Sequence, residues 1–205
     1  MDDAAMGGAA AGEGATDDAV MDNVPVDDAA LMDLVATEDV RAFEALYRAY
    51  HPRLTRFLRR MLRQPTLAEE VLDDTMMVVW RKAHAYDASS KPSTWIFAIA
   101  YRQALKALRR VGPVLAFDAD ESAGVPESEP DGELQRHQLR TQLDRTIALL
   151  SPEHRAVIEL TYFHGHSCRE IAEITGCPVA TVKTRMFYAR HKLKSLLAGL
   201  AEGAL

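Results

Sequence analysis

A set of donor and aromatic side chains near the C-terminus has the chemistry needed to read DNA. Between residues 179 and 197, apolar side chains recur at steps of four and three, which is the spacing of one buried helical stripe. The stripe comprises Val182, Met186, Ala189, Leu193 and Leu196. It leaves a second set pointing away from the core, namely Lys183, Thr184, Phe187, Tyr188, His191 and Lys194. Ammonium, hydroxyl and aromatic groups of this kind contact base edges in a DNA groove, so this helix is a candidate DNA reader.

The segment before this helix carries the signals that would position it. Ser167 followed by Glu170 is a capping box, which predicts a helix that opens at Cys168. Gly176 can adopt the left-handed conformation that ends a helix, and Pro178 suits the first turn of the next one. The residues that match a helix-turn-helix are Ala172 at the helix crossing, Gly176 at the corner and Val182 in the second helix. Such a motif places its second helix in the major groove of DNA.

A second candidate for nucleic-acid contact lies near the middle of the chain. The polar loop YDASSKPS, residues 86–93, precedes a helical pattern over 94–110 that contains three aromatic residues and ends in basic ones. Aromatic rings beside cations can hold unstacked bases while the cations follow the backbone. The alternative is that Trp95, Ile99 and Leu108 pack in the core, because helical spacing already accounts for them. The loop and the basic flank are then the stronger functional candidates.

Two further helices are expected before this loop. Apolar stripes from Phe43 to Leu62 alternate with arginines, and Gln64-Pro65 interrupts the pattern. Thr66 with Glu69 predicts a second capping box at the start of the next helix. The first half of that helix is acidic, through Glu69, Glu70, Asp73 and Asp74. These carboxylates could bind a basic partner. Alternatively, they could form a solvated helix face that complements the helix dipole, and spacing alone leaves both interpretations open.

Helical signals continue after residue 136. Apolar residues from Leu139 to Leu150 recur at helical spacing, and Ser151-Pro152 is an N-cap followed by proline at the first helical position. The patterns together predict an all-α fold of two small helical domains joined by a flexible acidic linker, the second domain containing the helix-turn-helix. We expect a disordered acidic tail over 1–36, with room for a short helix near 28–35. The first domain is expected over 37–111, the linker over 112–135 and the second domain over 136–199.

The net charge of -6 hides an uneven distribution. Residues 1–40 hold eleven Asp and Glu, and residues 112–135 hold seven, with no Lys or Arg in either segment. The remainder therefore carries 24 basic against 12 acidic residues, a charge of +12. The expected domains are cationic, as contact with phosphates requires. The acidic tail is expected to be a solubilising segment, and a DNA-mimicking autoinhibitory arm is the alternative hypothesis.

Metal, redox and membrane functions are disfavoured. His164, His166, Cys168 and Cys177 could be assembled into a zinc site or a redox pair. However, Cys177 is expected in the turn and Cys168 at a helix start, so we expect no metal and no cofactor. Two cysteines fit a reducing compartment. No apolar run approaches the roughly 18 residues of a membrane span, so we expect no membrane insertion and a cytoplasmic location.

The two blocks in this order resemble the extracytoplasmic-function group of bacterial RNA polymerase sigma factors, which retains regions 2 and 4 of the sigma-70 family. The resemblance covers roughly residues 39–111 and 136–197. LAEEVLDDTMMVVWRKA is similar to the polymerase-binding helix of that family, and STWIFAIAYRQALKALRR is similar to its promoter-melting helix. The segment that resembles region 4 is SPEHRAVIELTYFHGHSCREIAEITGCPVATVKTRMFYARHKL.

This resemblance implies a sigma factor without catalytic chemistry, which directs RNA polymerase to promoters. The implied polymerase-binding residues are Glu70, Asp73, Asp74 and Trp80. At the -10 element, the implied contacts are Ser89, Ser90, Lys91, Arg102, Lys106, Arg109 and Arg110. At the -35 element, Lys183, Thr184, Phe187 and Tyr188 would face bases, and Thr181, Arg185 and Arg190 would contact phosphates. The implied partners are core RNA polymerase, promoter DNA and an inhibitory anti-sigma factor.

Some positions depart from the family pattern. Arg102 and Lys106 stand where the family often has Asn and Asp, which should increase phosphate attraction. Asp73-Asp74 stands where a Gln-Glu pair is usual. Tyr188 stands where Arg is common, and since only Arg reads guanine bidentately, the preferred upstream sequence should differ.

Two other function classes agree less well with the sequence than a sigma factor does. A stand-alone helix-turn-helix regulator is the alternative, and the acidic helix disfavours it because such regulators usually carry a sensor domain instead. An enzyme has little support, since the sequence shows no glycine-rich phosphate loop, metal-ligand cluster or nucleophile-base signature.

Overall fold

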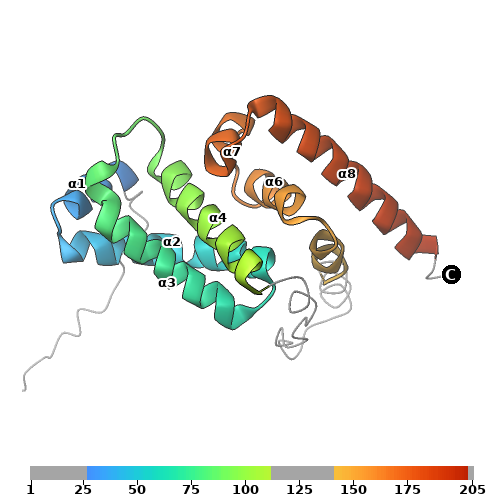
Figure 1. Ribbon diagram of the computed structural model, residues 1–205, viewed down its shortest axis with the longest axis horizontal. Coiled ribbons are helices and arrows are strands. Elements are labelled where there is room, and N and C mark those ends of the chain that lie inside the picture. Colours follow the sequence, from blue (N-terminus) through green and yellow to red (C-terminus); the bar gives the residue numbers. More distant parts are fainter. Residues whose placement is uncertain (1–26, 112–140, 203–205) are drawn as a thin grey trace, which may run out of the picture.

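The chain folds into helices throughout the part that the computed structural model describes, residues 27–111 and 141–202 (Figure 1). The helices are α1 (Asp28–Ala36), α2 (Val40–Leu62), α3 (Pro65–Lys82), the 3-10 turn η1 (Ala83–Ala85), α4 (Pro92–Val111), α6 (Pro152–Tyr162), α7 (Cys168–Thr175) and α8 (Val179–Glu202). Residues 141–148 are also helical. The expected all-α fold is confirmed. The expected linker, 112–135, and residues 1–26 of the expected tail lie outside the described residues.

The N-terminal half, residues 27–111, is built from α1 to α4. Asp39 caps α2 by accepting hydrogen bonds from the amides of Arg41 and Ala42, at 2.8 and 3.0 Å. Arg63 ends the helix in the left-handed conformation, with φ 62°. The interruption expected at Gln64-Pro65 is therefore present, and it lets α3 turn back against α2.

Helix α1 adds to this half, although its residues fall inside the range expected for the acidic tail. Met32 and Val35 are buried, at 0% and 1% exposed, and the Tyr50 hydroxyl donates a hydrogen bond to the Asp28 carboxylate. The short helix expected near 28–35 is present. The folded part of the chain thus starts no later than Asp28.

The capping box expected at Thr66 is wrong. The residue that precedes α3 is Gln64, which makes no side-chain capping bond, and Pro65 is the first helical residue. Proline fixes φ near the helical value and needs no partner for a missing N–H, so the helix starts two residues earlier than a cap at Thr66 would place it. Thr66 is already inside the first turn and cannot cap it.

The C-terminal half, residues 141–202, follows the local signals closely. Ser167 and Glu170 form the expected capping box, and Gly176 ends α7 in the left-handed conformation with φ 66°. The expected stripe of α8 faces inward, with Val182, Met186 and Ala189 buried. The helix-turn-helix is therefore formed by α7 and α8.

The two halves pack against each other. Helix α4 lies along α7, and α2 contacts α6, so buried residues of both halves belong to one apolar core (Figure 1). Aromatic contacts cross this boundary: the Phe97 ring lies 4.8 Å from the His164 ring and 5.1 Å from the His166 ring, centroid to centroid. The Lys91 ammonium pairs with the Glu170 carboxylate at 2.8 Å.

Replacing Ser167 with alanine should lower the free energy of unfolding by about 1 kcal/mol, because the Glu170 amide of α7 loses its capping acceptor. Thr66→Ala is the matched control, and it should change stability by less than about 0.5 kcal/mol, since Thr66 caps nothing. Urea unfolding of the full chain, followed by circular dichroism, measures both. Equal losses for the two variants would contradict this assignment of the caps.

Candidate nucleic-acid interface

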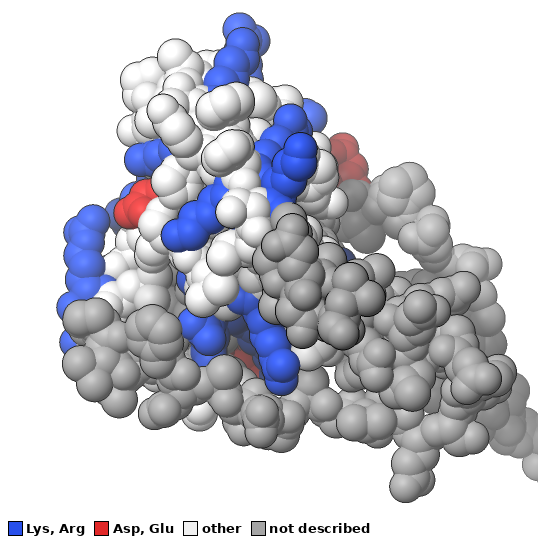
Figure 2. Space-filling model, turned by 90° about the vertical axis from the view of Figure 1, so that its right-hand side faces the viewer, with Lys and Arg blue, Asp and Glu red and all other residues white. Residues whose placement is uncertain are grey.

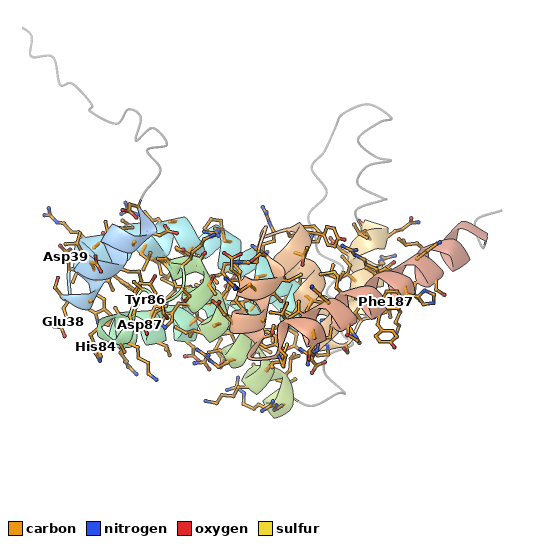
Figure 3. All side chains as sticks on the ribbon, turned by 90° about the horizontal axis from the view of Figure 1, so that it is seen from above. Glu38, Asp39, His84, Tyr86, Asp87 and Phe187 are labelled. Carbon is orange, nitrogen blue, oxygen red and sulfur yellow. The ribbon has the colours of Figure 1, made fainter. Side chains whose placement is uncertain are left out.

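The outer face of α8 presents two large aromatic side chains to solvent. Phe187 is 65% exposed and Tyr188 is 57% exposed, and their rings meet edge to face at 5.5 Å. Lys183 and Thr184 are exposed on the same helix, and Phe187 lies on its outer side (Figure 3). Neighbouring exposed rings of this size are uncommon on a protein surface unless they contact a partner. The four residues expected to face bases are thus brought together.

The three residues expected on phosphates have different surroundings. Arg190 is exposed, with its guanidinium 5.5 Å from the centre of the Tyr162 ring. Thr181 is half-buried at the start of α8. Arg185 is also half-buried, and its guanidinium donates to the Cys177 thiol at 3.6 Å, which holds it near the corner of the helix-turn-helix. Arg190 is therefore the more accessible of the two arginines.

A cavity of about 430 Å³ opens between α3, η1 and α4. Its lining residues are Val78, Lys82, Ala85, Trp95, Ile99, Arg102, Gln103 and Lys106. Arg102 and Lys106 were expected to contact DNA, whereas Lys82 was missed. One sequence signal could have indicated Lys82: it lies four residues after Val78, so the two side chains share one face of α3. Three cations around an indole ring can hold a base and its phosphates.

The loop before α4 is held by its own hydrogen bonds. The Ser89 amide donates to the Asp87 carboxylate at 3.0 Å, and the Ser89 side chain together with this amide lowers the pKa of Asp87. The Tyr86 hydroxyl donates to the Ser90 carbonyl. Lys91 is drawn away to Glu170, and that pairing raises the pKa of Lys91. Of the three loop residues expected at the -10 element, Ser89 remains exposed and Lys91 is engaged by the C-terminal half.

The end of α4 touches the acidic face of α3. Arg109 and Arg110 are both exposed, and the Arg110 guanidinium pairs with the Glu70 carboxylate at 2.8 Å. Arg110, which was expected to contact DNA, therefore pairs with Glu70, which was expected to contact polymerase. Exposed pairs of this kind contribute little stability, so either partner can be released at small cost.

The acidic face itself is open to solvent. Glu70, Asp73 and Asp74 are exposed, and the Tyr47 hydroxyl donates to Asp73 at 3.3 Å. Trp80 differs from them because it is half-buried, with its ring 5.0 Å from the Phe43 ring. The three carboxylates lie three and four residues apart and therefore on one side of α3, and Trp80 helps to hold α2 against α3.

Comparison with known proteins identifies the family. Models of sigma-70 region 2 and sigma-70 region 4 match residues 46–113 and 140–193. The chain is 35% identical to the ECF RNA polymerase sigma factor RpoE of Cereibacter sphaeroides, over 76% of this chain and 86% of the relative. The chain belongs to the extracytoplasmic-function (ECF) group of RNA polymerase sigma factors. It is also 32% identical to the sigma factor CarQ of Myxococcus xanthus, over 78% of this chain and 91% of CarQ.

Solved structures share this fold. One is the sigma factor RpoE from Bartonella quintana in complex with the anti-sigma factor NepR, with a TM-score of 0.59, 27% identity, and coverage of 78% of this chain and 98% of that one. Another is CnrH in complex with the cytosolic domain of CnrY, with a TM-score of 0.63, 24% identity, and coverage of 84% and 97%.

The charge distribution of this ECF sigma factor agrees with a nucleic-acid interface. The face seen in Figure 2 shows Lys and Arg side chains spread over the described surface, with few Asp or Glu between them. Within residues 27–111 and 141–202, no three His, Cys, Asp or Glu side chains are grouped so that they could hold a metal ion. No helix in the same ranges has the length and apolar character to cross a membrane.

Phe187→Ala should leave the free energy of unfolding within about 0.5 kcal/mol of wild type, because the ring is solvated. Met186→Ala, one residue earlier but 7% exposed, should lower it by about 2–5 kcal/mol because it leaves a core cavity. Thermal unfolding of both variants measures the difference. A large loss for Phe187→Ala would mean that this ring serves stability rather than recognition.

Proposed function

We propose that this sigma factor holds core RNA polymerase through α3, opens the -10 element with α4 and its preceding loop, and reads the -35 element with α8. The single observation that carries this division is that regions 2 and 4 match separate halves of the chain, each with its own exposed basic surface. A sigma factor of the ECF group directs RNA polymerase to promoters. We assign parts of that activity to three surfaces of the chain.

The polymerase contact rests on the acidic face of α3. Exposed Glu70, Asp73 and Asp74 would attract a basic partner surface and set its orientation. Trp80 would support this contact indirectly, because its packing on Phe43 holds α3 against α2. The pairing of Glu70 with Arg110 would be exchanged for the polymerase contact.

The -10 contact rests on the cavity between α3 and α4. Lys82, Arg102 and Lys106 would hold phosphates around a base that stacks near Trp95. Ser89 and Ser90 would approach the same strand from the loop, and Arg109 and Arg110 would follow the backbone beyond it. An unpaired base fits this site better than a duplex, because a flipped base can enter a cavity.

The -35 contact rests on the exposed face of α8. Lys183, Thr184, Phe187 and Tyr188 would meet base edges in the major groove. The Thr184 hydroxyl already donates to the Ala180 carbonyl at 3.0 Å, so it would act toward DNA as an acceptor or through its methyl group. Thr181, Arg185 and Arg190 would contact the flanking phosphates.

The protein would act without catalysing a reaction, and it would work in the cytoplasm, where polymerase and DNA are found. An anti-sigma factor is the proposed inhibitor, because the sigma factor RpoE from Bartonella quintana, which shares this fold, was solved in complex with the anti-sigma factor NepR. The stand-alone helix-turn-helix regulator that the sequence left as an alternative is set aside by the match to sigma-70 region 2 over residues 46–113. The acidic face of α3 disfavours it, since a regulator has no need of a polymerase-holding surface.

Run-off transcription tests the proposed function. Core RNA polymerase supplemented with the purified protein should initiate from a cognate promoter with no other sigma factor present. A protein that binds duplex DNA tightly by itself, yet never directs initiation, would support the regulator instead.

Lys183→Ala should weaken promoter use by about 1–3 kcal/mol through one base pair of the -35 element, while Arg109→Ala should weaken all promoters to a similar degree. The reason is that base contacts carry sequence information and phosphate contacts do not. Lys192→Ala is the matched control and should leave promoter use unchanged, since it removes an exposed lysine of α8 that is outside the expected DNA-facing set. Run-off assays on promoters with single substitutions measure these effects. If Lys183→Ala acted equally on every sequence, Lys183 would not be a base reader.

A further inference from the structure

Two arginines of α8 are each held by a side chain that lies outside that helix. The Arg185 guanidinium donates to the Cys177 thiol, in the turn before α8, at 3.6 Å. The Arg190 guanidinium lies 5.5 Å from the centre of the Tyr162 ring, at the end of α6. Neither Cys177 nor Tyr162 has a part in the proposed function, although both touch arginines that are proposed to contact phosphates at the -35 element.

A continuous series of hydrogen bonds ties Arg185 to α7. The Thr175 hydroxyl donates to the Ile171 carbonyl at 2.6 Å, so its proton is already used. The Cys177 thiol lies 3.2 Å from the same hydroxyl oxygen and is therefore the donor to it. The sulfur lone pairs of Cys177 then accept from Arg185. Because every group in the series donates in one direction, the series fixes the place of the guanidinium.

The backbone of the corner keeps Cys177 itself in place. Gly176 is in the left-handed conformation with φ 66°, and the Cys177 amide donates to the Ala172 carbonyl at 3.1 Å. This bond closes the end of α7, so the Cys177 backbone is fixed relative to that helix. Cysteine has a short side chain, whereas arginine has a long one with much rotamer entropy to lose. The contact therefore transfers the order of the corner to the flexible Arg185 side chain.

Tyr162 holds Arg190 through the face of its ring. A separation of 5.5 Å is within the range over which an aromatic face attracts a guanidinium. Tyr162 is 56% exposed and Arg190 is exposed too, so the pair lies at the surface. The ring is positioned in turn by the packing of α6 against α8. A contact through the guanidinium plane leaves the N–H groups at its edge to bind a phosphate.

The two arginines flank the outer face of α8 on opposite sides. Successive residues of an α-helix are about 100° apart around its axis, so Arg185 and Arg190 are separated by about 140° across the buried side. The wider arc between them carries the exposed residues Thr184 and Phe187. A helix about 10–12 Å wide fills a major groove about 12 Å wide, with one phosphate backbone on each side. Each arginine therefore matches one of the two backbones.

We propose that Cys177 and Tyr162 are positioning residues for the -35 element, each holding one arginine in place to bind the phosphate backbone on its side of the groove. The inference rests on the proposed function for the identity of the phosphates, whereas the order of the two arginines is a property of the free protein. An arginine that is ordered before binding loses less conformational entropy, and ordering a free one costs about two- to tenfold in affinity.

The order of the two arginines in the free full-length protein is the first test, measured by 15N relaxation of their Nε–H groups. Wild-type Arg185 and Arg190 should both be ordered. Cys177→Ala should make Arg185 mobile, whereas Cys177→Ser should keep it ordered, because a serine hydroxyl donates and accepts in the same way. Cys168→Ala is the matched control, since it removes the other cysteine, which is also half-buried. It should leave both arginines ordered.

Tyr162→Leu and Tyr162→Phe test the second contact in the same way. Leucine removes the aromatic face, so Arg190 should become mobile, whereas phenylalanine keeps the face and should keep Arg190 ordered. Both variants should retain their helix content by circular dichroism, because Tyr162 is largely in solvent. If phenylalanine weakened promoter binding as much as leucine does, Tyr162 would bind DNA through its hydroxyl and would not be a positioning residue.

Promoter binding by the holoenzyme, formed from core RNA polymerase and this protein, is the second test. The probe is a promoter fragment selected by the wild-type holoenzyme from a library randomised at the -35 element. Arg185→Ala should lower the slope of log Kd against log salt concentration by about 1, through loss of one phosphate contact. Cys177→Ala should weaken binding by about two- to tenfold, and Cys177→Ser should bind like wild type. Added to Arg185→Ala, Cys177→Ala should cost nothing more, because it acts only through that arginine.

Arginines that are mobile in the free wild-type protein would overturn the proposal. A Cys177→Ala variant that binds the fragment like wild type, or that weakens the Arg185→Ala holoenzyme further, would overturn it as well. Loss of helix content in Cys177→Ala would show that this side chain serves the fold instead. Unchanged salt slopes for both Arg185→Ala and Arg190→Ala, with the arginines still ordered in the free protein, would instead defeat the phosphate contacts of the proposed function.

Discussion

Helix α4 is buried on two sides at once, and the rest of the molecule depends on this constraint. It packs against α2 and α3 within the N-terminal half and against α7 of the C-terminal half. Phe97 and Tyr101 are buried, while Arg102 and Lys106 remain in solvent. A helix that is covered on two sides has one narrow face left, and here that face is basic. The position of α4 and the closeness of the two halves therefore have the same cause.

The boundary between the halves differs from the core of either one. The cores are aliphatic and aromatic, whereas the boundary includes charged side chains, two imidazoles and backbone carbonyls at a helix end. Burial lowers the pKa of His164 to about 4 and also lowers the pKa of His166, which favours the neutral imidazole at both positions. Polar groups hold such a boundary in one geometry but return to water at moderate cost.

Much of the fold and part of the site were predictable because they depend on neighbouring residues. The cap at Ser167, the stop at Gly176 and the exposed face of α8 all follow from side chains within one or two helical turns. The cap expected at Thr66 was wrong because Pro65 competes for the helix start. Lys82 was missed as a cavity residue because its place there depends on how α3 meets α4.

The sequence by itself determined the all-helical class, the helix-turn-helix and the basic and acidic faces, since periodicity and capping act over a few residues. Only the tertiary structure decided that Lys91 pairs with Glu170 and that Arg155 caps α2. Arg155 and Arg60 are 95 positions apart, and no local pattern marks either as a partner of the other. Their contact exists only because apolar burial brings α2 and α6 together, and burial then makes each charge require a partner.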